Sequence, residues 1–237
     1  MVFGILTAVA ACPAIIGTTE AVRYGQKKNN REEHRGRKYH LTVTLAERRS
    51  PYCPYFDNCP IVLYNNKLWV DTRKDGSAGD DYFPATTNYL PYPDRKEVWK
   101  KAGYAKGEGF VTWINYDRFL NWVYVDKETH EVKYGVKDEA NPHIVGPWDC
   151  TSIEKRLTFQ GWEGFIAVEE NDDDDLWALY FDVADDGLSD EGQVGTKKRR
   201  MLELEVWRKE MKREMQDAVN ERLERLEQRE ELGETVD

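Results

Sequence analysis

The sequence lacks the short motifs that mark the common catalytic and nucleotide-binding centres. It contains neither a GxxxxGK[ST] phosphate loop nor a GxGxxG turn after a strand. A GxSxG nucleophile elbow and an HExxH zinc helix are also missing. We therefore predict no catalytic residues and no cofactor, and we favour a protein that is not an enzyme.

Cysteine is scarce, with four in 237 residues. Cys12 lies in the apolar opening, which leaves Cys53, Cys59 and Cys150 for the rest of the chain. An odd number of cysteines does not make a disulfide framework, so the composition favours a reducing, intracellular compartment. Together with His143 these three thiols would supply four zinc ligands, but their spacing matches no common zinc module. We predict no metal site.

The chain lacks the basic excess that nucleic-acid binding requires, because its formal net charge is -10 and its pI is about 5.1. The charge is unevenly distributed. Residues 21–40 are strongly basic, whereas the acidic excess lies in residues 169–176 and 182–192. Such asymmetry indicates partners rather than fold, and it predicts no nucleic acid among them.

Residues 2–19 contain no charged side chain, and three interpretations of them remain open. A secretory signal fits poorly, because no Lys or Arg precedes the apolar run and Pro13 interrupts it. A buried helix or strand fits a run that is shorter than the roughly 20 residues of a full membrane span. A membrane anchor, kinked at Pro13 or held in one leaflet, is the third interpretation.

We favour the anchor because a basic segment follows the apolar run directly. Lys and Arg beside an apolar segment are attracted to anionic cytoplasmic lipid by about 1 kcal/mol each. Cys12 is a candidate for acylation, which would add a second attachment. The residues expected to contact the membrane surface are Arg23, Lys27, Lys28, Arg31, Arg35, Arg37 and Lys38. The predicted location is the cytoplasmic face of a membrane, with the cytoplasm as the alternative.

Residues 38–192 alternate between short β-branched or aromatic runs and turn residues, a pattern typical of antiparallel strands. A strand is expected within 38–47, and hairpins are expected within 61–72, 119–136 and 164–182. Asn65 and Asn66 tolerate the positive φ of the tight turn in the first hairpin. We predict a β-rich domain built as an antiparallel sheet, a sandwich or a partly closed barrel.

A long connection, residues 71–109, separates the first two hairpins. Within it, residues 94–104 predict one short helix with Asp94 as its N-cap and Gly103 at its end. If residues 76–109 formed a lid over a β-cup, Trp113, Trp122 and Trp177 would be the candidate ligand-pocket residues. The alternative, which we favour, is that these tryptophans fill the β core.

The segment 193–237 predicts a long charged amphipathic helix, because residues 197–232 contain no Gly or Pro and few poor helix formers. Apolar residues at steps of three and four give one narrow stripe, which predicts a coiled-coil or partner-binding arm. The stripe consists of Leu204, Trp207, Met211, Met215, Val219, Leu223 and Leu226. Residues 1–37 are the remaining part of the chain, an apolar N-terminal segment with a basic flank. Because a long helix would accompany the β-rich domain, the predicted fold class is α+β.

Four stretches of the sequence are distinctive: GILTAVAACPAIIGTTEAVR, NPHIVGPWDCT, LTFQGWEGFIAVEE and LWALYFDVADDGL. They resemble a group of uncharacterised proteins of filamentous fungi, and the likeness extends from Gly4 to about Leu188. The resemblance implies a eukaryotic cytoplasmic setting but no catalytic residue.

The sequence therefore predicts a non-enzymatic scaffold or interaction protein that is attached to a membrane by its N-terminus. Its partners would be the membrane surface, and a protein or a second copy bound through the C-terminal helix. The first alternative is a β-cup that binds a small ligand or acts on it. The second is a membrane-inserting toxin or defence protein.

Overall fold

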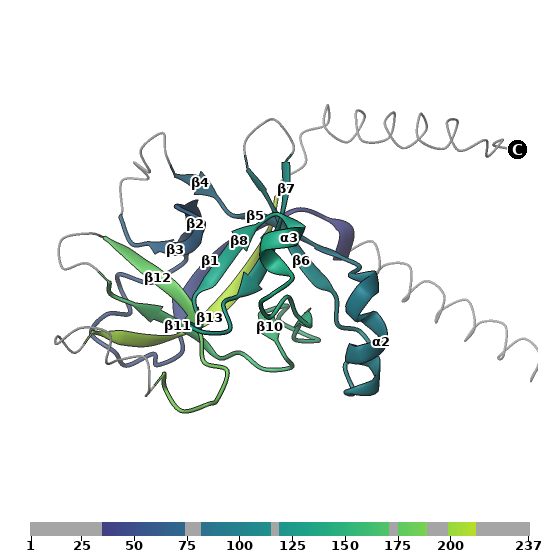
Figure 1. Ribbon diagram of the computed structural model, residues 1–237. Helices are drawn as coiled ribbons and strands as arrows, with labels where there is room; N and C mark the ends of the chain where they lie inside the picture. Colours follow the sequence, from purple (N-terminus) through teal and green to yellow (C-terminus); the bar gives the residue numbers. More distant parts are fainter. Residues whose placement is uncertain (1–34, 74–81, 115–118, 171–174, 189–198, 212–237) are drawn as a thin grey trace, which may run out of the picture.

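The computed structural model describes residues 35–73, 82–114, 119–170, 175–188 and 199–211. These residues form an antiparallel β-structure with two short helices on its outside (Figure 1). The strands are β1 (Tyr39–Leu45), β2 (Cys59–Tyr64), β3 (Lys67–Asp71), β4 (Phe83–Pro84), β5 (Thr86–Leu90), β6 (Gly109–Ile114), β7 (Phe119–Val125), β8 (Val132–Gly135), β9 (Trp148–Cys150), β10 (Leu157–Phe159), β11 (Phe165–Val168), β12 (Leu176–Phe181) and β13 (Met201–Glu210). The helices are α2 (Pro93–Lys101) and α3 (Lys137–Ala140).

Nine of the strands form a closed ring. The order is β12-β11-β13-β1-β5-β6-β7-β8-β3, and pairing of β12 with β3 closes it. Strand β2 pairs with both β1 and β3, and β9 with β10 forms a separate two-stranded sheet. Closure removes the free edges that an open sheet would expose.

Three hairpins, β2–β3, β7–β8 and β11–β12, meet at one end of the ring. Strand β3 pairs with β12 and with β8, and an isolated bridge between Glu131 and Tyr180 joins β8 to β12. Each hairpin therefore contacts the other two, and we call this end the hairpin triplet. Side chains at the tips of three distant sequence segments are brought together there.

The predicted hairpins are confirmed by the pairing of their strands. Asn65 and Asn66 have φ of 47° and 60°, as the two-residue turn between β2 and β3 requires. The predicted short helix is α2, which ends just before Gly103 at φ 94°. Its N-cap is Tyr92 rather than Asp94, because Pro93 begins the helix and Asp94 falls in the first turn.

The predicted α+β fold class is wrong, because the described residues are mostly antiparallel β-structure with two short helices, and no long C-terminal helix begins within them. Residues 201–210 form strand β13, which pairs with β1 from Tyr39↔Glu210 to Leu45↔Leu204 and also with β11. Buried and partly exposed residues alternate in the middle of β13, with Leu204, Val206 and Arg208 as the buried ones. Burial between two neighbouring strands outweighs the helix propensity of the segment. Residues 212–237 lie outside the described part of the chain.

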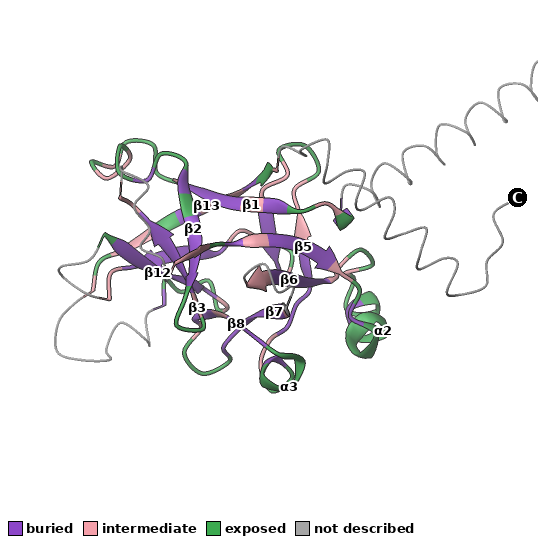
Figure 2. Cartoon of the chain, turned by 90° about the horizontal axis from the view of Figure 1, so that it is seen from above, coloured by how far each residue is buried: buried purple, intermediate pink, exposed green. Residues whose placement is uncertain are grey.

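The interior of the ring is filled by aromatic and aliphatic side chains. Most residues of the strands are buried, as their purple colour in Figure 2 shows. Trp148 is fully buried and lies against Phe110, Phe159 and Phe165, with ring centroids 5.2, 4.5 and 6.3 Å away. A smaller cluster, which we call the α2 cluster, fastens α2 to β6 and β7. Its buried members are Tyr92, Trp99, Val111, Trp122, Tyr124, Ala140 and Val145. Both helices remain largely exposed (Figure 2).

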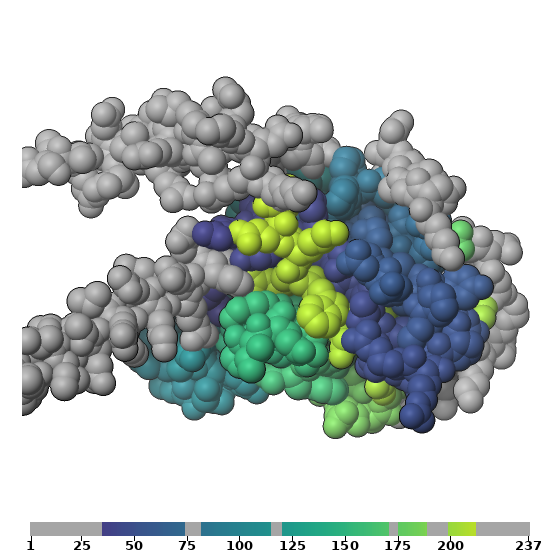
Figure 3. Space-filling view, turned by 180° about the vertical axis from the view of Figure 1, so that it is seen from behind, coloured from purple at the N-terminus to yellow at the C-terminus, as the bar shows by residue number. Residues whose placement is uncertain are grey.

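The first and last strands of the domain lie side by side, since β1 and β13 are antiparallel partners. On the face shown in Figure 3, β13 lies between the segment after β1 and residues near 150–157. Glu205 of β13 forms ion pairs with Arg48 and Arg156, at 2.5 and 3.5 Å, which join the three segments. Arg37 and Glu210, near the two ends of the described residues, form an ion pair at 2.6 Å, so these two ends lie close together.

Candidate functional site

The hairpin triplet carries a pocket of about 230 Å³, which we call the hairpin pocket. Its apolar wall consists of Val168, Leu188 and Met201. Its polar wall consists of Lys67, Glu128, Thr129, Glu131, Glu170, Tyr180 and Arg199. The lining comes from the start of β3, the β7–β8 turn, the end of β11 and the residues after it, β12, the segment after β12, and the start of β13 with the residues before it. The pocket therefore forms only when the three hairpins meet.

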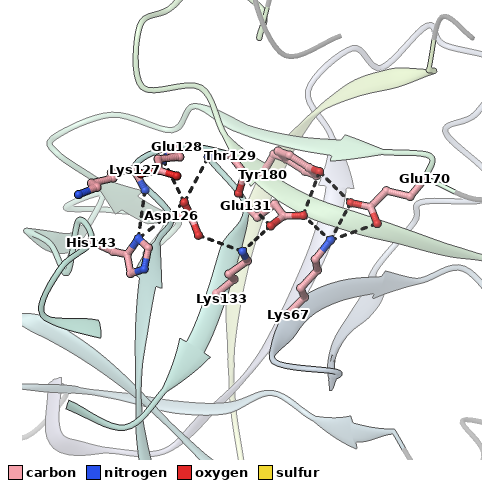
Figure 4. Close-up of polar contacts among 10 residues, drawn as sticks. All are labelled: Lys67, Asp126, Lys127, Glu128, Thr129, Glu131, Lys133, His143, Glu170 and Tyr180. Carbon is pink, nitrogen blue, oxygen red and sulfur yellow. Dashed lines mark hydrogen bonds and ion pairs between the residues drawn. The ribbon is translucent and has the colours of Figure 1, made fainter. Parts of the chain in front are cut away.

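Lys67 is the centre of the polar wall (Figure 4). Its Nζ forms an ion pair with Glu131 and lies 3.0 and 3.2 Å from the two carboxylate oxygens of Glu170. The Tyr180 hydroxyl donates to Glu170 at 2.7 Å and to Glu131 at 3.3 Å. The side chains of Glu131 and Glu170 are only 11% and 15% exposed, so Lys67 compensates two largely buried carboxylates.

A second lysine extends this chain of charges. Lys133 Nζ lies 2.6 Å from Glu131 and 2.9 Å from Asp126. Asp126 also accepts hydrogen bonds from the backbone N–H groups of Glu128, at 2.9 Å, and Thr129, at 3.2 Å. Carboxylates and lysines therefore alternate from Asp126 to Glu170, and the network fixes the β7–β8 turn beside the pocket.

Protonation of these groups follows from their contacts. Burial opposes ionisation of Asp126, but hydrogen bonds from the Glu128 N–H and from Lys133 outweigh it and lower its pKa to about 2. In Glu131 burial is likewise outweighed by Lys133 and Lys67, and the pKa is lowered. Burial, followed by the charge of Glu170, raises the pKa of Tyr180, which remains a hydrogen-bond donor.

We expect the network to make the protein acid-sensitive. The pKa of Asp126 falls from an ordinary 3.8 to about 2 on folding, so its contribution is complete above pH 3.8 and is lost as the pH falls towards 2. Replacing Asp126 with asparagine should lower the free energy of unfolding by up to about 2 kcal/mol at pH 7. Urea unfolding at pH 7, 4 and 2.5 measures this, and the difference should shrink at the lowest pH. An equal difference at all three values would contradict the assignment.

The three tryptophans predicted to line a ligand pocket lie apart from the hairpin pocket. Trp177 is buried in the main core beside Phe56, and Trp122 is buried against Tyr92 in the α2 cluster. Trp113 on β6 donates to Asn88 at 2.8 Å, under the ammonium group of Lys38. The described part of the predicted lid forms β4, β5 and α2, which belong to the body of the domain.

Of the residues predicted to contact a membrane surface, the structure describes Arg35, Arg37 and Lys38. Arg35 is buried and binds within the domain, to Glu108 at 2.7 Å, to Asp149 at 2.6 Å and to the Lys106 carbonyl at 2.9 Å. Arg37 and Lys38 lie nearer the surface. The candidate acylation site Cys12 and the other predicted contacts, Arg23, Lys27, Lys28 and Arg31, lie outside the described residues. Among the helices of the described ranges, none has the length and apolarity needed to cross a membrane.

The residues predicted for a partner-binding helix divide at the end of β13. Leu204 of β13 is buried in the core, and Trp207 donates from its Nε1 to the Thr44 hydroxyl at 2.9 Å. Both are part of the domain. Met211 follows the strand and is partly exposed, and Met215, Val219, Leu223 and Leu226 lie beyond the described residues.

The hairpin pocket was not found from the sequence. Its polar residues lie in segments around positions 67, 130, 170, 180 and 199, and none of these segments resembles a binding motif. The only local signal was the clustering of charge at hairpin tips, and such tips are ordinarily solvated loops.

A ring of antiparallel strands with a triplet of hairpins at one end defines an all-β domain. A model of the fungal beta-trefoil domain matches residues 17–212, and the chain belongs to this family. The fungal family agrees with the resemblance in the sequence, and the match covers all the described strands. No curated protein and no solved structure matches the chain.

Proposed function

We propose that the protein is a non-enzymatic interaction protein held at the cytoplasmic face of a membrane. Its β-trefoil domain would be the rigid body, its N-terminal segment the attachment, and the segment after β13 the contact for a protein partner. The observation that carries the proposal is a basic, exposed surface at the point where the N-terminal segment joins the domain.

That surface consists of α2 and the loop that follows it. Arg95, Lys96, Lys100, Lys101 and Lys106 are all exposed there, against the two carboxylates Asp94 and Glu97. The apolar side chain of Val98 is 56% exposed in their midst. Cations that surround an exposed apolar residue suit an anionic lipid surface, where each cation contributes about 1 kcal/mol.

Arg35 fixes the N-terminal segment beside this surface. It binds the Lys106 carbonyl and Glu108, both in the loop after α2, and its guanidinium lies 4.3 Å from the centre of the Tyr89 ring. Arg35 lies beside the loop after α2, so an anchor that precedes it and the surface of α2 would face the same membrane. The filled core supports an interaction protein rather than a β-cup, because Trp148 and its neighbours occupy the centre of the ring.

We expect Ala10→Asp to release the full-length protein from membranes, because a charge within an inserted apolar run costs about 2.5–3.5 kcal/mol. The double variant Lys96→Glu/Lys100→Glu should weaken binding to vesicles that contain phosphatidylserine and leave binding to neutral vesicles unchanged. Flotation of the full-length protein with both kinds of vesicle measures the two effects.

The matched control is Arg49→Glu/Lys127→Glu, which reverses two exposed charges outside α2. It should float like the unmodified protein. Recovery of the full-length protein in the soluble fraction, with and without anionic lipid, would overturn the membrane attachment.

A further inference from the structure

The hairpin pocket has the size and lining of a site for a small molecule. Its volume of about 230 Å³ lies below the 300–1,000 Å³ of pockets for drug-sized ligands. Buried Val168 and Leu188, with Met201, form an apolar wall opposite the charged one. A ligand that fills this space needs an aliphatic part and a compact polar part.

The charges of the polar wall favour a positive group on the ligand. Three carboxylates, Glu128, Glu131 and Glu170, line the pocket against the two cations Lys67 and Arg199. Beyond the lining, Asp126 and Lys133 add one charge of each sign and leave the imbalance unchanged. The described lining of the pocket therefore has an excess of one negative charge, which an ammonium group would neutralise.

The two cations differ in what they can offer a ligand. Lys67 directs its ammonium group to three carboxylate oxygens of Glu131 and Glu170, so its donors are already used. Arg199 forms no ion pair with a carboxylate of the described residues, although its charge lies close enough to lower the pKa of Tyr180 in part. Arg199 is thus the cation available to a carboxylate on the ligand.

We propose that the hairpin pocket binds a free α-amino acid with an aliphatic side chain. Glu170 and Glu128 would hold its ammonium group, Arg199 its carboxylate, and Val168, Leu188 and Met201 its side chain. Lys67 and Tyr180, which both contact Glu170, would hold its carboxylate in place. This site is independent of the proposed membrane attachment, because none of its residues belongs to α2 or to the N-terminal segment.

Calorimetric titration of the purified full-length protein with three probes tests the proposal. L-leucine carries both charges, L-leucinamide lacks the carboxylate, and 4-methylpentanoate lacks the ammonium group. We expect leucine to bind at least about tenfold more tightly than either of the others, which is one lost charged contact of about 1.4 kcal/mol. Absence of leucine binding up to about 10 mM would overturn the proposal, as would equal binding of 4-methylpentanoate.

Two variants separate the parts of the site. Arg199→Gln should reduce the affinity for leucine to that for leucinamide and leave leucinamide binding unchanged. Met201→Phe, which fills the pocket without changing charge, should abolish binding of both. Lys127→Gln, at an exposed residue outside the pocket lining, is the matched control and should bind leucine normally. An unchanged leucine affinity in both pocket variants would contradict the assignment.

These titrations do not depend on lipid. If vesicle flotation fails and leucine binds, the membrane proposal falls and the pocket assignment stands. If flotation succeeds and no probe binds, the pocket assignment falls and the membrane proposal stands.

Discussion

Replacing Trp148 with alanine is expected to lower the free energy of unfolding by about 3–5 kcal/mol. The side chain is fully buried and touches Phe110, Phe159 and Phe165, which come from three different strands. Its removal would leave a cavity that close-packed neighbours fill only in part. A loss of this size is a large share of the 5–15 kcal/mol that stabilises a typical domain. Guanidinium unfolding followed by tryptophan fluorescence measures it.

Trp148→Phe is the informative companion. The indole Nε1 has no hydrogen-bond partner in the described part of the chain, so phenylalanine loses volume but no polar contact. We expect a cost of about 1–2 kcal/mol, well below that of alanine. If both variants lost the same free energy of unfolding, the indole would contribute through a polar contact rather than through its volume. The packing of Trp148 would then be weaker evidence for a core without an internal ligand site.

The strands that could be predicted are those whose sequence contains its own turn. The hairpin β2–β3 was marked by Asn65 and Asn66 between two apolar runs, and both residues adopt the positive φ that the turn needs. Helix α2 was predicted in the same local way, from Asp94 as its expected N-cap and Gly103 after its end, and the structure differs only in that Pro93 begins the helix. Local chemistry was sufficient in these places because the structure depends on neighbours in sequence.

Strand β13 was missed because its partners are distant in sequence. Glu and Lys favour a helix, and Trp207, Met211 and Met215 continue its spacing. The signal for a strand was the alternation of residues 202–206, Leu-Glu-Leu-Glu-Val, which has the period of two expected when one face is buried. The period of two leads to a strand here only because β13 pairs with β1 and β11, which are distant in sequence.

The hairpin pocket was missed for a related reason. Lys67 and Glu170 are separated by 103 positions in sequence, and their contact exists only because hairpins β2–β3 and β11–β12 pair through β3 and β12. In the sequence, each of these two residues is a charged residue near a turn, and charged side chains at turns are ordinarily exposed to solvent. The ring closure converts these charges into a buried, compensated network.

Lys67→Met is the second change for which we expect a large effect. It removes the cation between Glu131 and Glu170, whose side chains are 11% and 15% exposed, and leaves two carboxylates close together with less compensation. Removing one partner of a buried pair typically costs about 3–5 kcal/mol, and we expect that loss at pH 7. Lys67→Arg retains the charge and should cost less.

The pH dependence of this variant identifies the cause of its loss. Lys67 is one of the two lysines that lower the pKa of Glu131, so its loss should raise that pKa, and the variant should then lose less stability on acidification than the unmodified protein. In the unmodified protein, the stability that comes from the lowered pKa values of Glu131 and Asp126 is complete above their ordinary values of 4.5 and 3.8 and is lost below them. The difference between the two proteins should therefore stay constant from pH 7 to pH 5 and shrink by about 1 kcal/mol between pH 5 and pH 3. Lys127→Met, at an exposed lysine, should stay within about 0.5 kcal/mol of the unmodified protein. A deficit for Lys67→Met that stays constant down to about pH 3 would show that lost packing, rather than uncompensated charge, destabilises the hairpin triplet.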